Sequence, residues 1–311
     1  MCLYTKYVLN PKYKPNKKNH GKPPVCKDKR LLYVPVKCGR CMECRKQKQR
    51  EWVTRLSEEI RNDNRGLFVT LTINDENFDK LRENEHEDGN DICTRAIRRF
   101  LERIRKETGK SVKHWAITEL GDKKGRYHLH GIFFCDPILI KRHWQYGFVF
   151  IGTWVNEATI FYITKYMMKK NEHDPNFIGK VLASKGIGSG YFKRADAKNN
   201  RYQAKKTNET YRLRNGAKVS LPQYYRNIIY SETDKEKLWI EKQERGYRYI
   251  MGIKVNVDDE KTYNQWLEHF QQMGTELYKD NPDEWDAAKQ RERLRKMKLY
   301  RERMRRNKPC G

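Results

Sequence analysis

The sequence lacks long hydrophobic runs. No apolar stretch approaches the roughly 18 residues that are needed to span a bilayer, and residues 1–18 have no apolar segment typical of a signal peptide. These absences argue against membrane insertion and against export. We therefore expect a cytoplasmic protein with no membrane partner.

Cysteine is too sparse for an extracellular disulfide framework, since only eight cysteines are spread over 311 residues. Three of them follow one another at spacings of three, namely Cys38, Cys41 and Cys44. With Cys2 or Cys26 as a fourth ligand, this run is compatible with a structural zinc site. The alternative is a set of reduced, free thiols in a loop. A ferredoxin-type cluster is disfavoured, because Lys48 occupies the position of its fourth cysteine.

Acidic residues are too few to balance the basic ones. The chain has 40 Asp and Glu against 67 Lys and Arg, a formal net charge of +27. A field of this size attracts polyanions, so nucleic acid is the expected partner. The excess is uneven: residues 1–66 have 18 basic and 6 acidic side chains, whereas residues 67–170 have 18 and 14.

Hydrophobic patterns are clearest in the nearly neutral middle of the chain. They predict strands at 67–73, 113–120, 127–134 and 147–154, and helices at 91–108, 138–144 and 156–170. Gly109 should end the first helix, and Asn156 should cap the last. This order predicts an α+β fold, an antiparallel sheet with helices packed on one face.

The remainder of the chain is more polar. Residues 184–191 are expected to form a flexible, glycine-rich loop, and helices are expected at 233–246 and 258–279. Residues 289–308 contain eleven Lys or Arg, which predicts a basic helix or a partly ordered tail. We therefore divide the chain into a basic, Cys-rich segment (1–66), a core (67–230) and a basic, mainly helical C-terminal region (231–311).

A hairpin in this core brings candidate metal ligands together. His128 and His130 flank Leu129 on one strand, so a period of two places both imidazoles on one face. If the turn is centred between Lys123 and Lys124, Glu119 lies opposite His128 and shares that face. Two imidazoles and a carboxylate suit a divalent cation that also holds a substrate oxygen. The alternative is a solvated His-x-His face with no metal.

Two tyrosines share one face of the following helix. At 100° per residue, Tyr162, Lys165 and Tyr166 lie opposite the apolar stripe, which is formed by Ile160, Phe161, Ile163, Thr164, Met167 and Met168. A nearby cation and a lysine can stabilise a phenolate and the charge that develops on an attacked phosphate. The tyrosines could instead stack on bases without chemistry. Together with the hairpin, they favour transesterification at a DNA phosphodiester.

These segments resemble a known family. The strand LFVTLT, the hairpin TELGDKKGRYHLHGI and the helix YITKYMMKK resemble, in order, the three motifs of the HUH endonucleases that start rolling-circle replication. The Tyr-x-x-Lys-Tyr pair and the N-terminal YVPVKCGRCMECRKQKQREW resemble replication initiators of microviruses, in particular gokushovirus-like phages. The resemblance covers roughly residues 1–230 and implies a five-stranded antiparallel sheet with flanking helices.

The resemblance also implies an enzyme mechanism. His128, His130 and Glu119 would hold Mg²⁺ or Mn²⁺. Tyr162 would attack single-stranded origin DNA to leave a 5′-phosphotyrosyl link and a free 3′-OH, and Tyr166 would act at the end of a round, although the spacing does not give the order of the two tyrosines. Lys165 would contact phosphate or steady the developing charge. The expected partners are origin DNA and a host polymerase, in the cytoplasm of a bacterial host.

Further contacts to DNA are expected from four basic residues of the core, namely Lys123, Lys124, Arg126 and Lys169. A P-loop would need a glycine at Ile104 to accompany Gly109–Ser111, so the chain has no such ATPase motif and a host helicase is expected to separate the strands.

Two other functions compete with this interpretation. A non-enzymatic, zinc-stabilised nucleic-acid-binding regulator would explain the charge and the cysteines, but it leaves the His, Tyr and Lys pattern to chance. A related nickase of a transposon or plasmid would share the chemistry, and the microvirus-like N-terminal segment argues against it.

Overall fold

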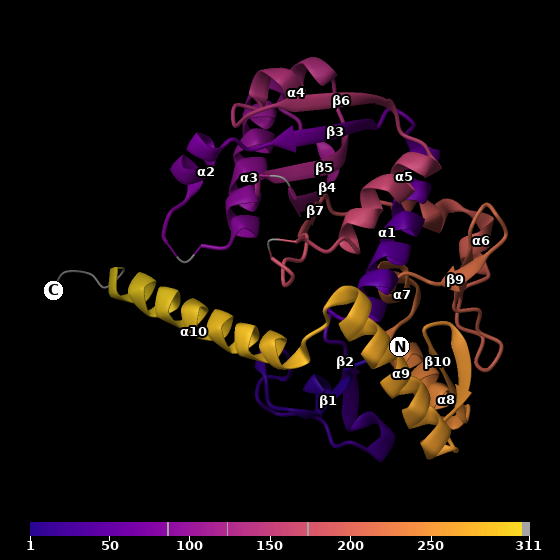
Figure 1. Cartoon of the computed structure of the whole chain (residues 1–311). Coiled ribbons are helices and arrows are strands. Elements are labelled where there is room, and N and C mark those ends of the chain that lie inside the picture. The colour runs from indigo at the N-terminus through magenta and orange to yellow at the C-terminus, as the bar shows by residue number, and fades with distance from the viewer. Residues whose placement is uncertain (86, 123, 173, 307–311) are drawn as a thin grey trace. The chain divides into compact units, whose positions relative to one another are not determined.

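A computed structural model describes all residues except 86, 123, 173 and 307–311 (Figure 1). The chain divides into two compact units. The core unit is formed by Arg45–Arg245, and the terminal unit combines Met1–Cys44 with the chain from Gly246 on. This division joins the two ends of the chain, whereas the division expected from the sequence separated them at residues 66 and 230.

The core unit is built on a five-stranded sheet of order β6-β3-β5-β4-β7, in which every neighbouring pair is antiparallel. Its strands are β3 (Leu67–Thr72), β4 (Lys113–Leu120), β5 (Tyr127–Phe134), β6 (Val149–Trp154) and β7 (Val181–Ala183). The predicted five-stranded antiparallel sheet is confirmed. The sequence patterns predicted the first four strands, and they missed the short edge strand β7.

Helices cover both faces of this sheet, so the prediction of helices on one face only is wrong. One face packs against α3 (Gly89–Thr108) and α4 (Pro137–His143), with α2 (Asp75–Leu81) beside α3 (Figure 1). The other face packs against α1 (Met42–Asn62) and α5 (Glu157–Thr164). The reason lies in the strands, whose apolar side chains point to both faces of the sheet. Both faces therefore need to be covered by helices.

Strand β4 illustrates this two-sided pattern. Ala116 belongs to the hydrophobic cluster with α3, while its neighbours Trp115 and Ile117 belong to the cluster with α1 and α5. All three side chains are fully buried. The acidic segment after β3 contains the helix α2.

Capping residues set the helix boundaries near the site. Gly109 adopts a left-handed conformation (φ 69°) after α3, and the side chain of Asn156 accepts a hydrogen bond from Thr159 at the start of α5, as predicted. Helix α5 ends at Thr164, however, and a 3-10 turn, η4 (Lys165–Met167), follows it. The Thr164 hydroxyl donates to the carbonyl of Ile160 (2.8 Å), a back-bond that disturbs regular helix geometry.

The rest of the core unit packs around tyrosines. It contains β8 (Thr210–Arg212), β9 (Lys218–Ser220), η5 (Ser189–Lys193), α6 (Ala195–Lys198), α7 (Gln223–Ile229) and α8 (Glu232–Glu244). Tyr191, Tyr211, Tyr225 and Tyr230 are all buried there. The expected flexible loop at 184–191 is packed instead, because the Tyr225 hydroxyl donates to the carbonyl of Gly188.

The terminal unit consists of two hairpins and two long helices. Its elements are β1 (Lys6–Leu9), η1 (Pro11–Tyr13), η2 (Lys17–Asn19), η3 (Lys29–Leu31), β2 (Tyr33–Val36), β10 (Tyr247–Ile250), β11 (Ile253–Asn256), α9 (Glu260–Tyr278) and α10 (Pro282–Arg306). The helices α8, α9 and α10 confirm the helical character predicted for the C-terminal region. Tyr4 packs edge-on against Trp285 of α10, which ties the two ends of this unit together (centroid distance 5.8 Å).

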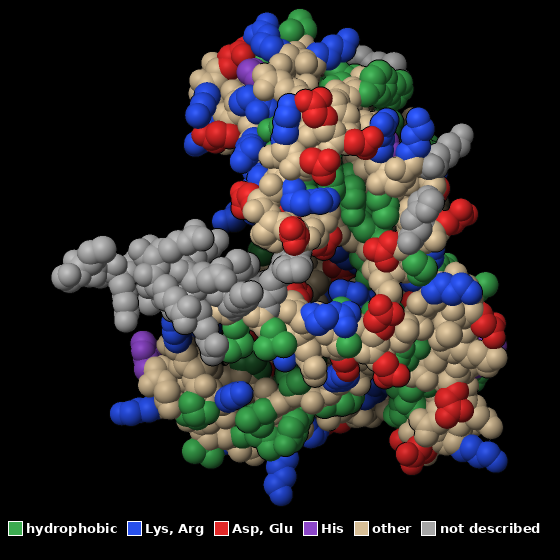
Figure 2. All heavy atoms as spheres, turned by 60° about the vertical axis from the view of Figure 1, so that its left-hand side comes forward, with side chains coloured by type: hydrophobic (Ala, Val, Ile, Leu, Met, Phe, Trp, Pro, Cys, Tyr) green, Lys and Arg blue, Asp and Glu red, His purple; other side chains and the backbone are tan. Residues whose placement is uncertain are grey.

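No helix among the described residues combines the length and the apolar character required to cross a membrane. Figure 2 shows that Lys and Arg side chains are interspersed with Asp and Glu on the face it presents, rather than gathered in one patch.

Candidate active site

The predicted pairing of Glu119 with His128 is confirmed by the hairpin of β4 and β5. Their Cα atoms are direct partners in the antiparallel register. His130, two residues further along β5, approaches the same carboxylate, with 2.5 Å between its Nε2 and Oε2 of Glu119. The two imidazole rings lie 6.3 Å apart. All three side chains therefore share the sheet face that α1 and α5 cover.

Two threonines of β3 orient these histidines, and the sequence patterns had not assigned them a role. Thr70 lies opposite His130, and Thr72 lies opposite His128. Each hydroxyl oxygen is 3.0 Å from the Nδ1 atom of its histidine. With Nδ1 engaged in this way, Nε2 is the nitrogen of each ring that faces a cation, and in His130 the cation would replace the contact of Nε2 with Glu119.

Burial and charge determine the protonation of this cluster. Burial alone would raise the pKa of Glu119, but hydrogen bonds from His130 and Lys169 outweigh it and lower the pKa below the usual range. Burial lowers the pKa of His128, because the low-dielectric surroundings disfavour an imidazolium. A carboxylate and a neutral imidazole are the forms that bind divalent cations.

The donor atoms of His128, His130 and Glu119 suit a divalent cation in their chemistry, although they are not tightly grouped. Two imidazole Nε2 atoms and an ionised carboxylate form a mixed nitrogen and oxygen donor set suited to Mn²⁺ or Mg²⁺. These ligand atoms are less tightly grouped than those of the cysteines. In the described part of the chain, the cysteines are the only cluster of His, Cys, Asp or Glu in which three or more ligand atoms lie within 4.8 Å of one another. The second oxygen of Glu119 instead accepts a hydrogen bond from Lys169.

The tyrosine pair lies directly against the histidines. The Tyr166 ring stacks on His130, with 4.2 Å between centroids and 1° between planes. Its hydroxyl donates to the hydroxyl oxygen of Tyr162 (3.1 Å), whose side chain is 44% exposed. Burial and the neighbouring Tyr162 raise the pKa of Tyr166. The two phenols are therefore inequivalent: one is packed on the candidate ligands and the other faces solvent.

The helical wheel around these tyrosines is only partly correct. Ile160, Ile163 and Met167 are buried, as the apolar stripe predicted. Phe161 was placed in the same stripe, yet 51% of its side chain is exposed. Lys165 lies over the Tyr162 ring, with its ammonium 3.9 Å from the ring centroid. An ammonium at this distance makes a cation–π contact with the ring.

The basic residues expected to contact DNA have different surroundings. Lys169 pairs with Asp122 (2.7 Å) beside Glu119, and Arg126 pairs with Asp75 (2.7 Å). Lys124 is exposed, and Lys123 lies outside the described residues. A role in DNA binding stays a prediction for all four.

A basic cavity elsewhere in the core unit was not predicted. It has a volume of about 540 Å³, and its lining includes the cationic residues Arg61, Arg194, Arg212, Arg214 and Lys218. A neighbouring hollow shares Arg61 and Arg214 and extends to Phe161 on the helix of Tyr162. The positive charge is scattered over several elements, so no single run of sequence indicates it.

The cysteine candidates separate into two groups. Cys2, Cys38, Cys41 and Cys44 lie together and form a cluster that could hold a metal ion. Cys26 lies apart from this cluster, and its thiol donates to the carbonyl of Asp28 (3.0 Å).

Comparison with known proteins links the chain to phage replication. Residues 66–171 match the family model of the ORF2-type replication-associated proteins. The replication-associated protein ORF4 of Chlamydia phage 1 is 26% identical over 194 residues, which cover 51% of this chain and 46% of the relative. The replication-associated protein ORF2 of Spiroplasma virus 4 is 31% identical over 188 residues, which cover 50% and 57%.

A third relative aligns over more of its length. The replication-associated protein VP4 of Bdellovibrio phage phiMH2K is 25% identical over 242 residues, which cover 68% of this chain and 72% of the relative. The chain spans about half the length of the first two relatives. No solved structure matches. The matches confirm the resemblance to phage replication proteins seen in the motifs: the chain is similar to replication-associated proteins of several phages.

Proposed function

We propose that this protein initiates rolling-circle replication by nicking and rejoining single-stranded origin DNA through metal-dependent tyrosine transesterification. The packing of Tyr166 on His130 is the observation that best supports the proposal, because it puts a nucleophile pair against a candidate cation site. A DNA-binding regulator would have no need of this arrangement. The relatives named for replication agree with it.

Mg²⁺ or Mn²⁺ held by His128, His130 and Glu119 would polarise the scissile phosphate and offset the charge that develops on it. The protein's own residues prepare this donor set. Thr70 and Thr72 orient the imidazoles, and Lys169 helps to keep the carboxylate of Glu119 ionised.

Tyr162 is the better placed of the two tyrosines to attack first. It is exposed, its oxygen accepts a hydrogen bond from Tyr166, and the Lys165 ammonium lies over its ring. Together these features place an accessible phenolic oxygen beside a positive charge, as an attack on a phosphate requires. Tyr166 has a raised pKa and donates a hydrogen bond to its neighbour, which suits a supporting role in the first step.

The first step exchanges one phosphodiester for another. The Tyr162 oxygen forms a bond to phosphorus as the bond from phosphorus to the 3′ oxygen breaks. The phenolic proton is lost, and the departing 3′ oxygen takes up a proton to become a free 3′-OH that a host polymerase can extend. In the later step Tyr166 attacks the new junction in the same way, and the released 3′-OH attacks the Tyr162 phosphodiester to close a circle.

The test is covalent capture of DNA. The purified chain is incubated with Mn²⁺ and labelled single-stranded oligonucleotides that tile its genome of origin, and the labelled protein is digested and mapped by mass spectrometry. We expect a 5′-phosphotyrosyl adduct on Tyr162, which Tyr162→Phe removes and which Tyr166→Phe leaves able to form. Tyr249→Phe, at an exposed tyrosine of the terminal unit, is the matched control.

Two results would contradict the proposal. One is the absence of any adduct across the whole tiled pool. The other is an adduct that persists in the double variant Tyr162→Phe with Tyr166→Phe. An adduct that maps first to Tyr166 would keep the chemistry and reverse the proposed order.

A further inference from the structure

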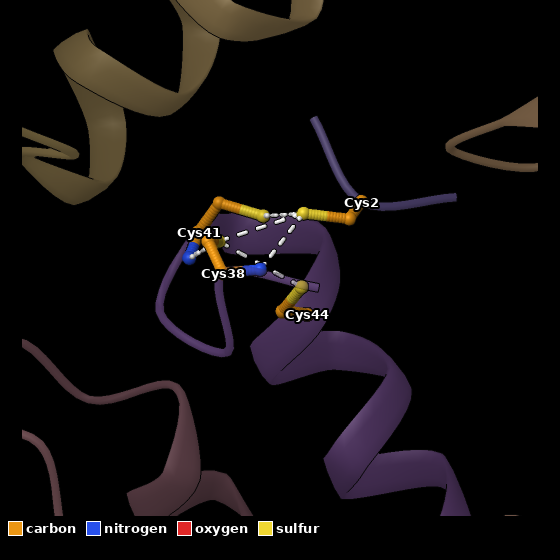
Figure 3. Close-up of side chains that lie close together, drawn as sticks. All are labelled: Cys2, Cys38, Cys41 and Cys44. Carbon is orange, nitrogen blue, oxygen red and sulfur yellow. Dashed lines mark hydrogen bonds between the residues drawn. The ribbon is translucent and has the colours of Figure 1, made fainter. Parts of the chain in front are cut away.

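Four cysteines from three segments of the terminal unit point their sulfur atoms toward one another (Figure 3). Cys2 comes from the segment before β1, Cys38 and Cys41 from the loop between β2 and α1, and Cys44 from the first turn of α1. All four Sγ atoms lie within 4.8 Å of one another. The contacts in this group are Cys2–Cys38 at 3.5 Å, Cys2–Cys41 at 3.9 Å and Cys38–Cys44 at 3.9 Å.

These separations match the edges of a small tetrahedron. A zinc ion binds thiolate at about 2.3 Å, so four sulfurs around one ion stand about 3.8 Å apart. A disulfide would need about 2.05 Å between two sulfurs, and every described cysteine is free. The arrangement therefore has the dimensions of a ligand shell, and the cysteines are not paired in disulfides.

The surrounding backbone supports charge on the sulfurs. The amides of Arg40 and Cys41 point at Sγ of Cys38 (3.5 and 3.3 Å), and the amide of Cys38 points at Sγ of Cys2 (3.3 Å). Gly39 allows this turn by adopting a left-handed conformation (φ 78°). Such amide donors stabilise thiolates, which are the forms that bind a metal.

Positive residues lie close to the cluster. A cavity of about 260 Å³ is lined by Cys38, by four cationic residues that include Lys37 and Arg40, and by the carboxylates of Asp286, which pairs with Lys6, and Glu292. One Zn²⁺ with four thiolates has a net charge of −2, and nearby cations offset such a charge. Cys2, Cys41 and Cys44 are meanwhile buried, so the shell is closed to solvent on most sides.

We propose that Cys2, Cys38, Cys41 and Cys44 bind one Zn²⁺ as a closed structural site. Four protein ligands leave no position for water or substrate, which is the pattern of structural zinc. The sequence left open whether Cys2 or Cys26 is the fourth ligand. The structure favours Cys2, because Cys26 lies outside the cluster. The site is independent of the proposed nickase chemistry.

The ion would join segments that few other contacts hold. The loop that it closes between Cys2 and Cys38 contains only short strands and 3-10 turns. Next to the cluster, the Met42 amide donates to Asp280 (2.8 Å) and Gln271 donates to the carbonyl of Leu3 (2.8 Å). Zinc would thus fix the first residues and the start of α1 in positions where α9 and its C-terminal end can meet them.

Metal analysis of the full chain tests this proposal. The protein is purified without chelator, with any tag after its last residue, and zinc is measured by mass spectrometry of the elements. We expect one zinc per chain in the wild type and in the control Cys26→Ser. Cys41→Ser and Cys2→Ser should each lose at least half of it.

A second measurement avoids the risk that a variant fails to fold. A mercurial reagent added to the wild-type protein should release one zinc as four thiols react, as detected with a metal-binding dye. Cobalt exchanged into the site should give the visible absorption of a tetrahedral tetrathiolate. Wild-type protein without zinc, an iron-sulfur chromophore, a Cys2–Cys38 disulfide or zinc loss in Cys26→Ser would each overturn the proposal.

Discussion

The two units of this chain differ in how they present potential metal ligands. In the core unit, two histidines and a glutamate lie on a sheet face beside an exposed tyrosine. In the terminal unit, four cysteines surround a common centre and are mostly buried. A mixed nitrogen and oxygen set with an open side suits an exchangeable cation and a substrate, whereas a closed sulfur set suits a permanent ion. Both sets are mostly buried, so ligand type, ligand spacing and the neighbouring tyrosines, rather than burial, distinguish a candidate site for chemistry from a candidate site for structural support.

The largest expected effect comes from removing a ligand in the core unit. His130→Ala deletes both a candidate ligand and the ring on which Tyr166 stacks. We expect adduct formation to fall on the order of a hundred- to a thousand-fold, with bound zinc unchanged. The measurement is the initial rate of adduct formation in Mn²⁺, and His269→Ala, at an exposed histidine of α9, is the control. A loss of zinc in His130→Ala would break the distinction between the two units.

The reciprocal change is made in the terminal unit. Cys41→Ser should lower the free energy of unfolding by about 3 kcal/mol or more, because zinc binding contributes directly to folding. Denaturant unfolding followed by circular dichroism measures this. The fraction of chains that remain folded should still form the adduct at a rate close to that of the wild type. A Cys41→Ser protein that is fully folded and inactive would assign the cysteines to the chemistry.

A smaller effect is expected at the threonines that orient the imidazoles. Thr70→Val and Thr72→Val keep the shape of the side chain and remove the hydroxyl that contacts Nδ1. We expect the Mn²⁺ concentration for half-maximal adduct formation to rise about 10- to 100-fold. The rate at saturating Mn²⁺ should change less. An unaltered Mn²⁺ dependence would show that strand packing alone orients the histidines.

The basic end of α10 is expected to contribute to DNA affinity and not to cleavage. Residues 293–311 contain nine Lys or Arg and one Glu, and their removal leaves Trp285 and its contact with Tyr4 in place. We expect affinity for single-stranded DNA to fall about tenfold at moderate salt and its salt dependence to become less steep. Cleavage at saturating DNA should persist. Unchanged affinity would show that this segment has another task.

The smallest effect concerns pH. Burial lowers the pKa of His128, so the imidazole stays neutral at pH values where a free histidine, with a pKa of about 6.5, is half protonated. Its capacity to bind a cation is therefore fully present above pH 6.5 and is lost only as pH falls through the lower folded-state value. We expect the Mn²⁺ requirement to be constant from pH 8 to about 6.5 and to rise below it. A rise already between pH 8 and 7 would contradict this protonation state.

Local patterns in the sequence were sufficient to predict much of the core unit. The apolar residues of strands β3 to β6 and of helix α3 recur at clear strand and helix spacings. The short turn between β4 and β5 set the register that pairs Glu119 with His128. The remaining features depend on contacts between distant segments. Strand β7 has three residues and exists through its pairing with β4, some 65 positions earlier in the chain.

The candidate site shows the same limit. The part played by Thr70 and Thr72 depends on the register between β3 and β5, which no turn sets, although a Thr-x-Thr spacing on the first motif strand was a usable signal. Phe161 is exposed because it lies about 100° round the helix from Ile160, at the edge of the apolar stripe of α5. The choice between Cys2 and Cys26 required the path of the whole N-terminal segment.

The discontinuous terminal unit has a consequence for biosynthesis. During translation, residues 45–245 leave the ribosome before α9 and α10 exist, so the sheet and its tyrosines can form while the first 44 residues still lack the helices they pack on. Domains generally fold as units in the order of their synthesis. The contacts of Leu3 and Met42 with residues 271 and 280 can be made only afterwards. The part of the molecule proposed to cut DNA is thus completed first, and the part that rests on both ends of the chain is assembled last.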